Sequence, residues 1–195
     1  MKKIFLALML ALATVGAQAQ ITAPVVEEKP ETDARYLAGA VPEENGQVYL
    51  TRTIDVPASL SQAEVMQRLD AWLTRCTKDE RMLSNQRLTQ PAANVLHHNC
   101  VLELTFSKSF ISHDFANINY VIVLTAQPGK VTMEMKRITY KYNDGNKMQK
   151  YSGEELISDK YALNKKGRLI YGYKKFRMKT IDLMDELAVS LQGVF

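Results

Sequence analysis

Histidine and cysteine are the residue types in this sequence that proteins most often use for metal binding and nucleophilic catalysis. His98 and Cys100 are two positions apart, so on a strand they face the same side, as a thiol–imidazole pair or two zinc ligands would. A zinc site needs three or four convergent ligands, and only Cys76 and His113 could add nitrogen or sulfur donors, because His97 faces away from His98. The sequence therefore predicts no catalytic Cys–His pair, no metal site and no cofactor.

Two further pairs could in principle carry hydrolytic chemistry. His113-Asp114 resembles a ligand pair of metal phosphohydrolases, but such sites need more His and Asp ligands than this chain offers. Glu154-Glu155 would be neighbours on a helix and point apart, whereas a retaining glycosidase sets its two carboxyls about 5 Å apart across the substrate. The sequence also contains no glycine-rich phosphate loop, Gly-x-Ser-x-Gly or His-Glu-x-x-His motif. These observations favour a protein without enzymatic activity.

Basic and aromatic side chains are interleaved between positions 171 and 179, a composition typical of surfaces that bind nucleic acids or anionic glycans. The residues of this candidate binding patch are Tyr171, Tyr173, Lys174, Lys175, Arg177 and Lys179. The secretion signal described below argues against a nucleic acid, so another envelope protein or an anionic glycan is the expected kind of partner. The alternative, favoured by the alternation in residues 170–173, is a strand with aromatic side chains on one face and charges on the other.

The two cysteines leave two alternatives open. Cys76 closes an apolar helical stripe, and Cys100 is in phase with Leu102 and Leu104 on a strand, so both are expected at one helix–sheet interface. In an exported protein such a pair could form a disulfide. Equally, both could be buried free thiols that act as small hydrophobic side chains.

The first residues have the three parts of a secretory signal peptide: lysines at positions 2 and 3, an apolar stretch over 4–15, and Ala-Gln-Ala at 17–19. The apolar stretch is shorter than the eighteen or so residues that a membrane-spanning helix needs, and no second one follows. The cleavage site lacks the cysteine of a lipoprotein. We expect cleavage of residues 1–19 and a periplasmic or secreted protein without a transmembrane segment.

The rest of the chain has the length of one domain. Residues 20–35 contain prolines and acidic side chains and are expected to form a flexible leader, so the domain should cover 36–195. The formal net charge of +4 falls to about +2 without the two signal-peptide lysines, so overall charge indicates little about partners. Basic residues are concentrated within 128–179, which predicts one basic face, or a surface whose charges balance in the folded protein.

Alternating apolar and polar residues predict the strands of an antiparallel sheet. Strands are expected at 47–56, 95–106, 117–125 and 131–142, with a short edge strand at 148–152. Pro128-Gly129 should form a type II turn that joins two of these strands into a hairpin, and 144–146 should form another turn. The apolar phase changes around Lys136 and Arg137, which predicts a β-bulge there.

Two helices are expected. Ser61 and Glu64 form a capping box for a helix whose apolar face ends at Cys76, and Thr180 is expected to cap a final helix. Residues 78–94 are polar and predict no regular element. The expected fold is α+β, with an antiparallel sheet of about four to five strands, two helices on one face and the order β-α-β-β-β-(β)-α.

Three segments of the sequence resemble the domain of unknown function 4468 family: 35–42 (RYLAGAVP), 161–166 (YALNKK) and 175–183 (KFRMKTIDL). The resemblance would extend over about residues 36–192. It implies a fold like that of the TATA-binding protein (TBP) and an exported protein of gut bacteria, and it supplies no catalytic or binding residues. A fold shared with a DNA-binding protein does not imply DNA binding.

Together these features predict a non-enzymatic binding or envelope-associated module. The alternatives are an envelope hydrolase with a site that is not visible in the sequence, and a structural subunit of an envelope complex. A concave pocket with titratable groups of shifted pKa would favour the hydrolase, whereas an exposed apolar or basic patch would favour the binding module.

Overall fold

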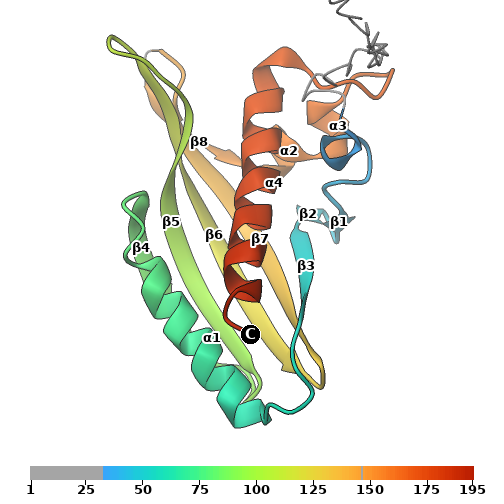
Figure 1. The fold of residues 1–195 in the computed structure, drawn as a ribbon. Helices are drawn as coiled ribbons and strands as arrows, with labels where there is room; N and C mark the ends of the chain where they lie inside the picture. Colours follow the sequence, from blue (N-terminus) through green and yellow to red (C-terminus); the bar gives the residue numbers. More distant parts are fainter. Residues whose placement is uncertain (1–32, 146) are drawn as a thin grey trace, which may run out of the picture.

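A computed structural model describes residues 33–145 and 147–195 (Figure 1). The expected signal peptide, nearly all of the expected leader and Asn146 of the second expected turn lie outside the described residues. The described chain opens with the 3₁₀ helix η2 (Ala34–Tyr36) and a small hairpin of β1 (Glu43–Glu44) and β2 (Gln47–Val48).

The described residues contain a six-stranded antiparallel sheet, which confirms the predicted fold class with more strands than expected. Its strands are β3 (Leu50–Asp55), β4 (Met82–Arg87), β5 (Val95–Lys108), β6 (His113–Gln127), β7 (Lys130–Asn143) and β8 (Met148–Ser152). They lie in the order β3-β7-β6-β5-β4, and β8 also pairs with β7. Because β3 and β8 pair with different halves of β7, they share its outer side.

The predicted bulge is confirmed. It explains how β7 can pair with both β3 and β8 on its outer side. Arg137 has a φ of 55°, and the pairing between β6 and β7 shifts between Asn119 and Val121. The extra residue changes which alternate positions face the core, and the apolar residues on both sides of it are buried: Met133, Met135, Ile138 and Tyr140. The turn at Pro128-Gly129 is also as predicted, since Gly129 has a φ of 74° and the turn connects β6 to β7.

The strand β4 is a correction to the sequence-based expectation that residues 78–94 are irregular. Its polar sequence does not alternate, and none of its side chains is fully buried. Backbone pairing with β5 makes it a strand, and an edge strand needs no apolar face to form such a ladder. The register shifts between Met82 and Ser84.

The first long helix, α1 (Gln62–Cys76), begins as predicted. The Ser61 hydroxyl accepts a hydrogen bond from the Glu64 backbone, and the Glu64 carboxylate accepts one from the Ser61 backbone. This reciprocal capping satisfies amide groups that the first turn would otherwise leave unpaired. The apolar face of α1 is buried against the sheet through Val65, Leu69, Trp72 and Leu73.

The last helix, α4 (Tyr171–Gln192), begins well before the predicted start at Thr180. Thr180 is fully buried inside the helix, where its hydroxyl donates to the Phe176 carbonyl at 2.7 Å and lies 2.6 Å from the Tyr140 hydroxyl. A threonine that bonds back to the carbonyl four residues earlier does not need to cap a helix. Two short helices, α2 (Gly153–Ile157) and α3 (Asp159–Ala162), precede α4.

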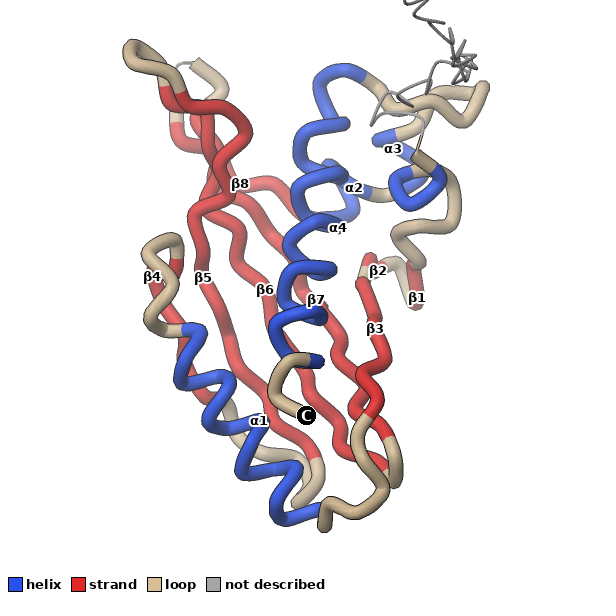
Figure 2. The backbone as a smooth tube through the Cα atoms, viewed as in Figure 1, coloured by secondary structure: helices blue, strands red, loops and turns tan. Residues whose placement is uncertain are grey.

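Both long helices lie on one face of the sheet, as predicted, and leave the other face uncovered (Figures 1 and 2). By their residue contacts, α1 packs on β6, while α4 packs on β3 and β5. The hydrophobic core fills the space between the helices and the sheet. Within the described residues, no helix combines the length and apolar character needed to cross a bilayer.

Candidate functional site

The candidate binding patch predicted at 171–179 is helical, so the alternative of an alternating strand is wrong. Spacings of three and four residues bring side chains together on a helix, and they divide the patch between two faces. Tyr171, Lys174, Lys175 and Lys179 share one face, whereas Tyr173 and Arg177 lie on another. Only the first face can therefore serve as a continuous binding surface.

Arg177 is fully buried and holds other segments against α4. Its guanidinium donates to the carbonyl oxygens of Tyr36 at 2.6 Å, Leu37 at 2.5 Å and Ile157 at 2.6 Å. It also donates to the Asp159 carboxylate at 2.7 Å. Burial lowers the pKa of Arg177, and the ion pair with Asp159 opposes that shift. Arg177 therefore has a structural role and is not available to a partner.

Lys175 is half-buried in an aromatic pocket at the start of α4. Its ammonium lies 4.8 Å from the ring centre of Phe106, 4.4 Å from that of Tyr142 and 5.4 Å from that of Phe176. It donates to Asp114 at 2.8 Å and to the Tyr142 hydroxyl at 2.7 Å. Burial by itself lowers the pKa of Lys175, but these two hydrogen bonds outweigh it, and the net shift is upward. The lysine stays charged and helps to fix α4 on the sheet.

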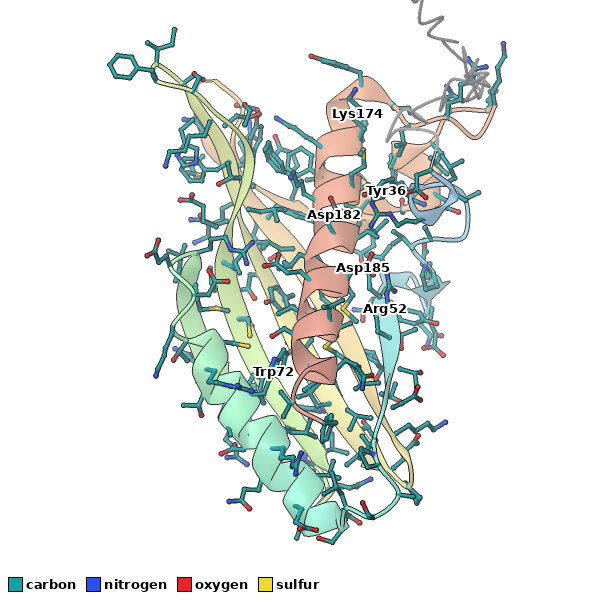
Figure 3. The ribbon with its side chains drawn as sticks, in the orientation of Figure 1. Tyr36, Arg52, Trp72, Lys174, Asp182 and Asp185 are labelled. Carbon is teal, nitrogen blue, oxygen red and sulfur yellow. The ribbon has the colours of Figure 1, made fainter. Side chains whose placement is uncertain are left out.

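A network of charged side chains ties η2 and β3 to α4 (Figure 3). The Tyr36 hydroxyl donates to Asp182 at 2.5 Å, and Arg52 pairs with Asp185 at 2.6 Å. Arg35 donates to the Tyr36 hydroxyl and lies 3.6 Å from both aspartates. Burial and the hydrogen bond to Asp182 raise the pKa of Tyr36 to about 12. Because each group has a partner of opposite or complementary character, the network is structural.

Three connected hollows follow the exposed side of α4, and we call them the α4 groove. The upper hollow, of about 360 Å³, lies between Tyr36 and Phe106. It shares Phe106 and Lys179 with a middle hollow of about 440 Å³, which in turn shares Arg81 and Glu186 with a lower one of about 280 Å³. The groove therefore runs from the start of α4 to the space between α4 and α1.

The two ends of the α4 groove differ in charge. Its upper part is lined by Lys108, Lys174, Lys175 and Lys179 around the apolar side chains of Phe106 and Met178, together with the carboxylates of Glu103 and Asp182. Below them Arg81 pairs with Glu186 at 2.6 Å and with Asp79 at 2.7 Å. The Arg81 hydrogen bond holds the pKa of Asp79 below its usual value. The upper part thus has more basic than acidic side chains beside an apolar floor, whereas the lower part contains an ion-pair cluster of one arginine and two carboxylates.

The side chain of Trp72 lines the lower end of the groove and lies between α1 and α4 (Figure 3). Its side chain is 2% exposed, and the indole N–H donates to the Ser190 hydroxyl at 3.0 Å. A separate hollow at the start of α1, lined by Val56, Leu60 and their neighbours, contains no titratable side chain.

The histidines and acidic pairs considered for catalysis are placed apart from the groove or have structural partners. The Nδ1 atom of buried His98 lies 2.6 Å from the Asn85 side-chain oxygen, and burial lowers the His98 pKa. His113 lies 3.3 Å from Glu103, and Asp114 holds Lys175. Glu154 accepts a hydrogen bond from the Val48 backbone, while Glu155 caps α2. The described residues contain no cluster of three or more metal-ligating side chains.

Cys76 and Cys100 are both free thiols in the structure. Cys100 is 3% exposed, and Cys76 is partly buried beside Trp72 in the lower groove. Burial raises the pKa of Cys76 to about 11 and that of Cys100 to about 12. Both groups therefore hold their protons at neutral pH and resemble small hydrophobic side chains.

We expect both thiols to react with iodoacetamide at pH 8 at least about a hundredfold more slowly in the folded protein than in urea, because only the thiolate reacts. Mass spectrometry after unfolding without reductant should show two modified cysteines. No modification after unfolding would instead show that the pair forms a disulfide, the other alternative that the sequence leaves open.

The fold and the groove define the class of protein to which the chain belongs: an α+β protein with a TBP-like sheet whose helices lie on one face. A TBP-like protein from Parabacteroides distasonis has this fold, with a TM-score of 0.63, 20% sequence identity and coverage of 79% of this chain and 96% of the other. A comparison with curated proteins gave no match.

The chain belongs to the DUF4468 family, a domain of unknown function with TBP-like fold, whose family model matches residues 51–141. The crystal structure of a DUF4468 family protein from Bacteroides ovatus is similar to it, with 32% identity and a TM-score of 0.74. The match covers 83% of this chain and 94% of that one. The family that the sequence resembles is thereby confirmed, while the three segments that suggested it lie outside the residues matched by the family model.

Proposed function

We propose that the chain is an exported, non-enzymatic binding module of the cell envelope and that the upper α4 groove is its contact surface for an anionic partner. The observation that carries this proposal is the concentration of lysines around an apolar floor. Lys179 is exposed and, among the described residues, forms no ion pair, so its charge is available to a ligand. An anionic glycan or an acidic surface of another envelope protein has the complementary charge.

The charge states of the groove favour binding over proton transfer. Hydrogen bonds raise the pKa values of Lys175 and Arg81 and lower that of Asp79, so each group is held in its charged form. A general acid or base works best with a pKa near the working pH. The pKa values of these three groups are shifted away from neutral pH. The shifts therefore support fixed charges that position a ligand.

The signal peptide expected from the sequence supports the proposed export. A protein that works outside the cytoplasm meets anionic glycans and other envelope proteins more readily than nucleic acids. The TBP-like fold by itself supplies no argument for DNA binding, because one fold can serve many functions.

Tagged mature protein should capture a stoichiometric partner from the detergent-solubilised envelope of its source cells, identified as protein or glycan by mass spectrometry. The variant Lys179→Glu should reduce the recovered partner about five- to tenfold, because it places a negative charge against an anionic ligand. The matched control is Lys130→Glu, since Lys130 is also exposed but lies at the β6–β7 turn, outside the groove.

Equal recovery with both variants would show that the partner does not bind the groove. If the wild-type protein captures nothing, the binding proposal fails, and a hydrolase acting on a small substrate becomes the better candidate.

A further inference from the structure

Four of the seven large hydrophobic side chains that are exposed in the described residues lie in or next to three connections at one end of the molecule. Phe110 and Ile111 are 104% and 91% exposed at the β5–β6 turn. Met148 is 56% exposed beside the β7–β8 turn, and Tyr171 is 85% exposed in the first turn of α4. We call this end, with these four side chains, the tip face. Large apolar side chains gathered at one exposed site usually mark a contact surface.

Strand pairing explains why the three connections lie together. Lys108 pairs with His113 next to the β5–β6 turn, and Ala116 of β6 pairs with Tyr142 near the end of β7. The first turn of α4 is fixed to the same end because Lys175 contacts both Asp114 and Tyr142. Figure 1 shows the β5–β6 hairpin extending beyond the rest of the sheet, next to the β7–β8 turn and on the side where α4 begins.

The turn that carries Phe110 and Ile111 satisfies part of its own backbone. The Ser109 amide donates to the Ser112 carbonyl at 2.8 Å, and the Ser112 amide donates to the Ser109 hydroxyl at 3.1 Å. The two apolar residues occupy the central positions of this closed turn, so they project outward as a pair. Internal hydrogen bonds lower the cost of moving a turn from water into a less polar layer.

Basic side chains surround the tip face. The exposed ones next to the β5–β6 and β7–β8 turns are Lys108, Lys147 and Lys150. The nearby carboxylates are engaged within the protein, because Asp114 holds Lys175 and Asp144 accepts a hydrogen bond from Gln149 at 2.8 Å. This end of the molecule therefore combines a protruding apolar pair with an excess of positive charge.

We propose that the tip face docks on the surface of an anionic phospholipid bilayer, with Phe110 and Ile111 inserted at the level of the headgroups. Aromatic side chains and lysines are enriched at membrane–water interfaces, and basic residues near the surface are attracted to anionic lipids. No membrane-spanning helix is needed for such binding, which depends on buried apolar area together with charge. The inference rests on the proposed envelope location and adds a second surface, which adjoins the α4 groove at Lys108.

Co-sedimentation with lipid vesicles tests the proposal on the mature chain. The protein should bind vesicles of phosphatidylglycerol and phosphatidylethanolamine, bind phosphatidylcholine vesicles at least tenfold more weakly, and dissociate as salt is raised. The double variant Phe110→Asp/Ile111→Asp should lose at least tenfold in the partition coefficient for the anionic vesicles. The matched control Leu83→Asp/Val189→Asp adds the same charge at two exposed apolar positions outside the tip face and should bind as the wild type does.

A fluorescent reporter gives a second readout. In the variant Phe110→Trp, anionic vesicles should shift the emission to shorter wavelength as the new indole leaves water. Trp72 is the sole native tryptophan and is 2% exposed, so it supplies a constant background. An unchanged spectrum, or equal vesicle binding by the tip-face variant and its control, would overturn the proposal.

The groove variant separates this inference from the proposed function. Lys179→Glu should retain most of the vesicle binding while losing the captured partner. Loss of the partner from the tip-face variant, without any binding of the wild type to vesicles, would instead identify the tip face as a protein-binding surface and contradict the membrane proposal.

Discussion

Replacing Arg177 with methionine should lower the free energy of unfolding by about 3–5 kcal/mol, measured by urea denaturation followed by circular dichroism. Methionine fills part of the space but donates no hydrogen bond. The carbonyl oxygens of Tyr36, Leu37 and Ile157 would remain in the interior without their donor. Each such unsatisfied group costs about 1–3 kcal/mol. The loss should also release η2 from α4, because Tyr36 is the last residue of η2 and Leu37 is its C-cap.

Two control variants separate geometry from charge. Lys179→Met removes a positive charge from an exposed position of the same helix and should change stability by less than about 0.5 kcal/mol. Arg177→Lys keeps the charge but cannot reach all four acceptors, so its stability should fall between those of the wild type and Arg177→Met. A stable Arg177→Met variant would mean that the chain satisfies these carbonyls in another way.

Replacing Trp72 with alanine should cost about 3–5 kcal/mol, the usual range for removing a buried tryptophan from a packed core. Trp72 is 2% exposed and bridges the two long helices through its hydrogen bond to Ser190. The substitution opens a cavity next to the lower α4 groove. Circular dichroism is the suitable measurement, because the variant has no other tryptophan to report unfolding.

The contribution of the hydrogen bond can be measured separately. Ser190→Ala should cost about 1 kcal/mol or less, since it removes one hydrogen bond from an exposed hydroxyl while the indole remains packed. Trp72→Phe should be intermediate, because it retains part of the apolar volume. If Trp72→Ala and Ser190→Ala were equally destabilised, the packing of the indole would contribute little, contrary to the expected result.

The elements that the sequence predicts correctly are those determined by neighbouring residues. The Ser61–Glu64 capping box places the start of α1, and the Pro128-Gly129 pair places a turn between β6 and β7. The change of apolar phase near Arg137 reveals the bulge, since a strand has a strict period of two. In each case the signal and the structure lie within a few residues of one another.

The features that the sequence does not reveal depend on distant contacts. The strand β4 forms through its backbone pairing with β5, and its side chains carry no alternation. The start of α4 has no side-chain cap, and Thr180, which resembles a cap in the sequence, is instead bonded to Tyr140 in the core. Short-range patterns cannot distinguish these cases, because the deciding partner lies far along the chain.

The same reason limits prediction of the candidate site. The sequence identifies the basic residues of 171–179, but it groups Arg177 with them although its acceptors lie near residues 36 and 157. It also gives no sign that Phe106 and Arg81 complete the groove, since both come from other strands and loops. The exposed Phe110-Ile111 pair is visible in the sequence only as two apolar residues between strands.

The contacts between the first and last segments also constrain the order in which the protein can fold. The β5–β6–β7 hairpins pair residues close in sequence and can form early, whereas β3 pairs with β7 and η2 with α4 across long separations. During synthesis the N-terminal segment must wait for the final helix before it can dock. For a chain exported as proposed, this delay keeps η2 undocked, and so competent for translocation, until synthesis is nearly complete.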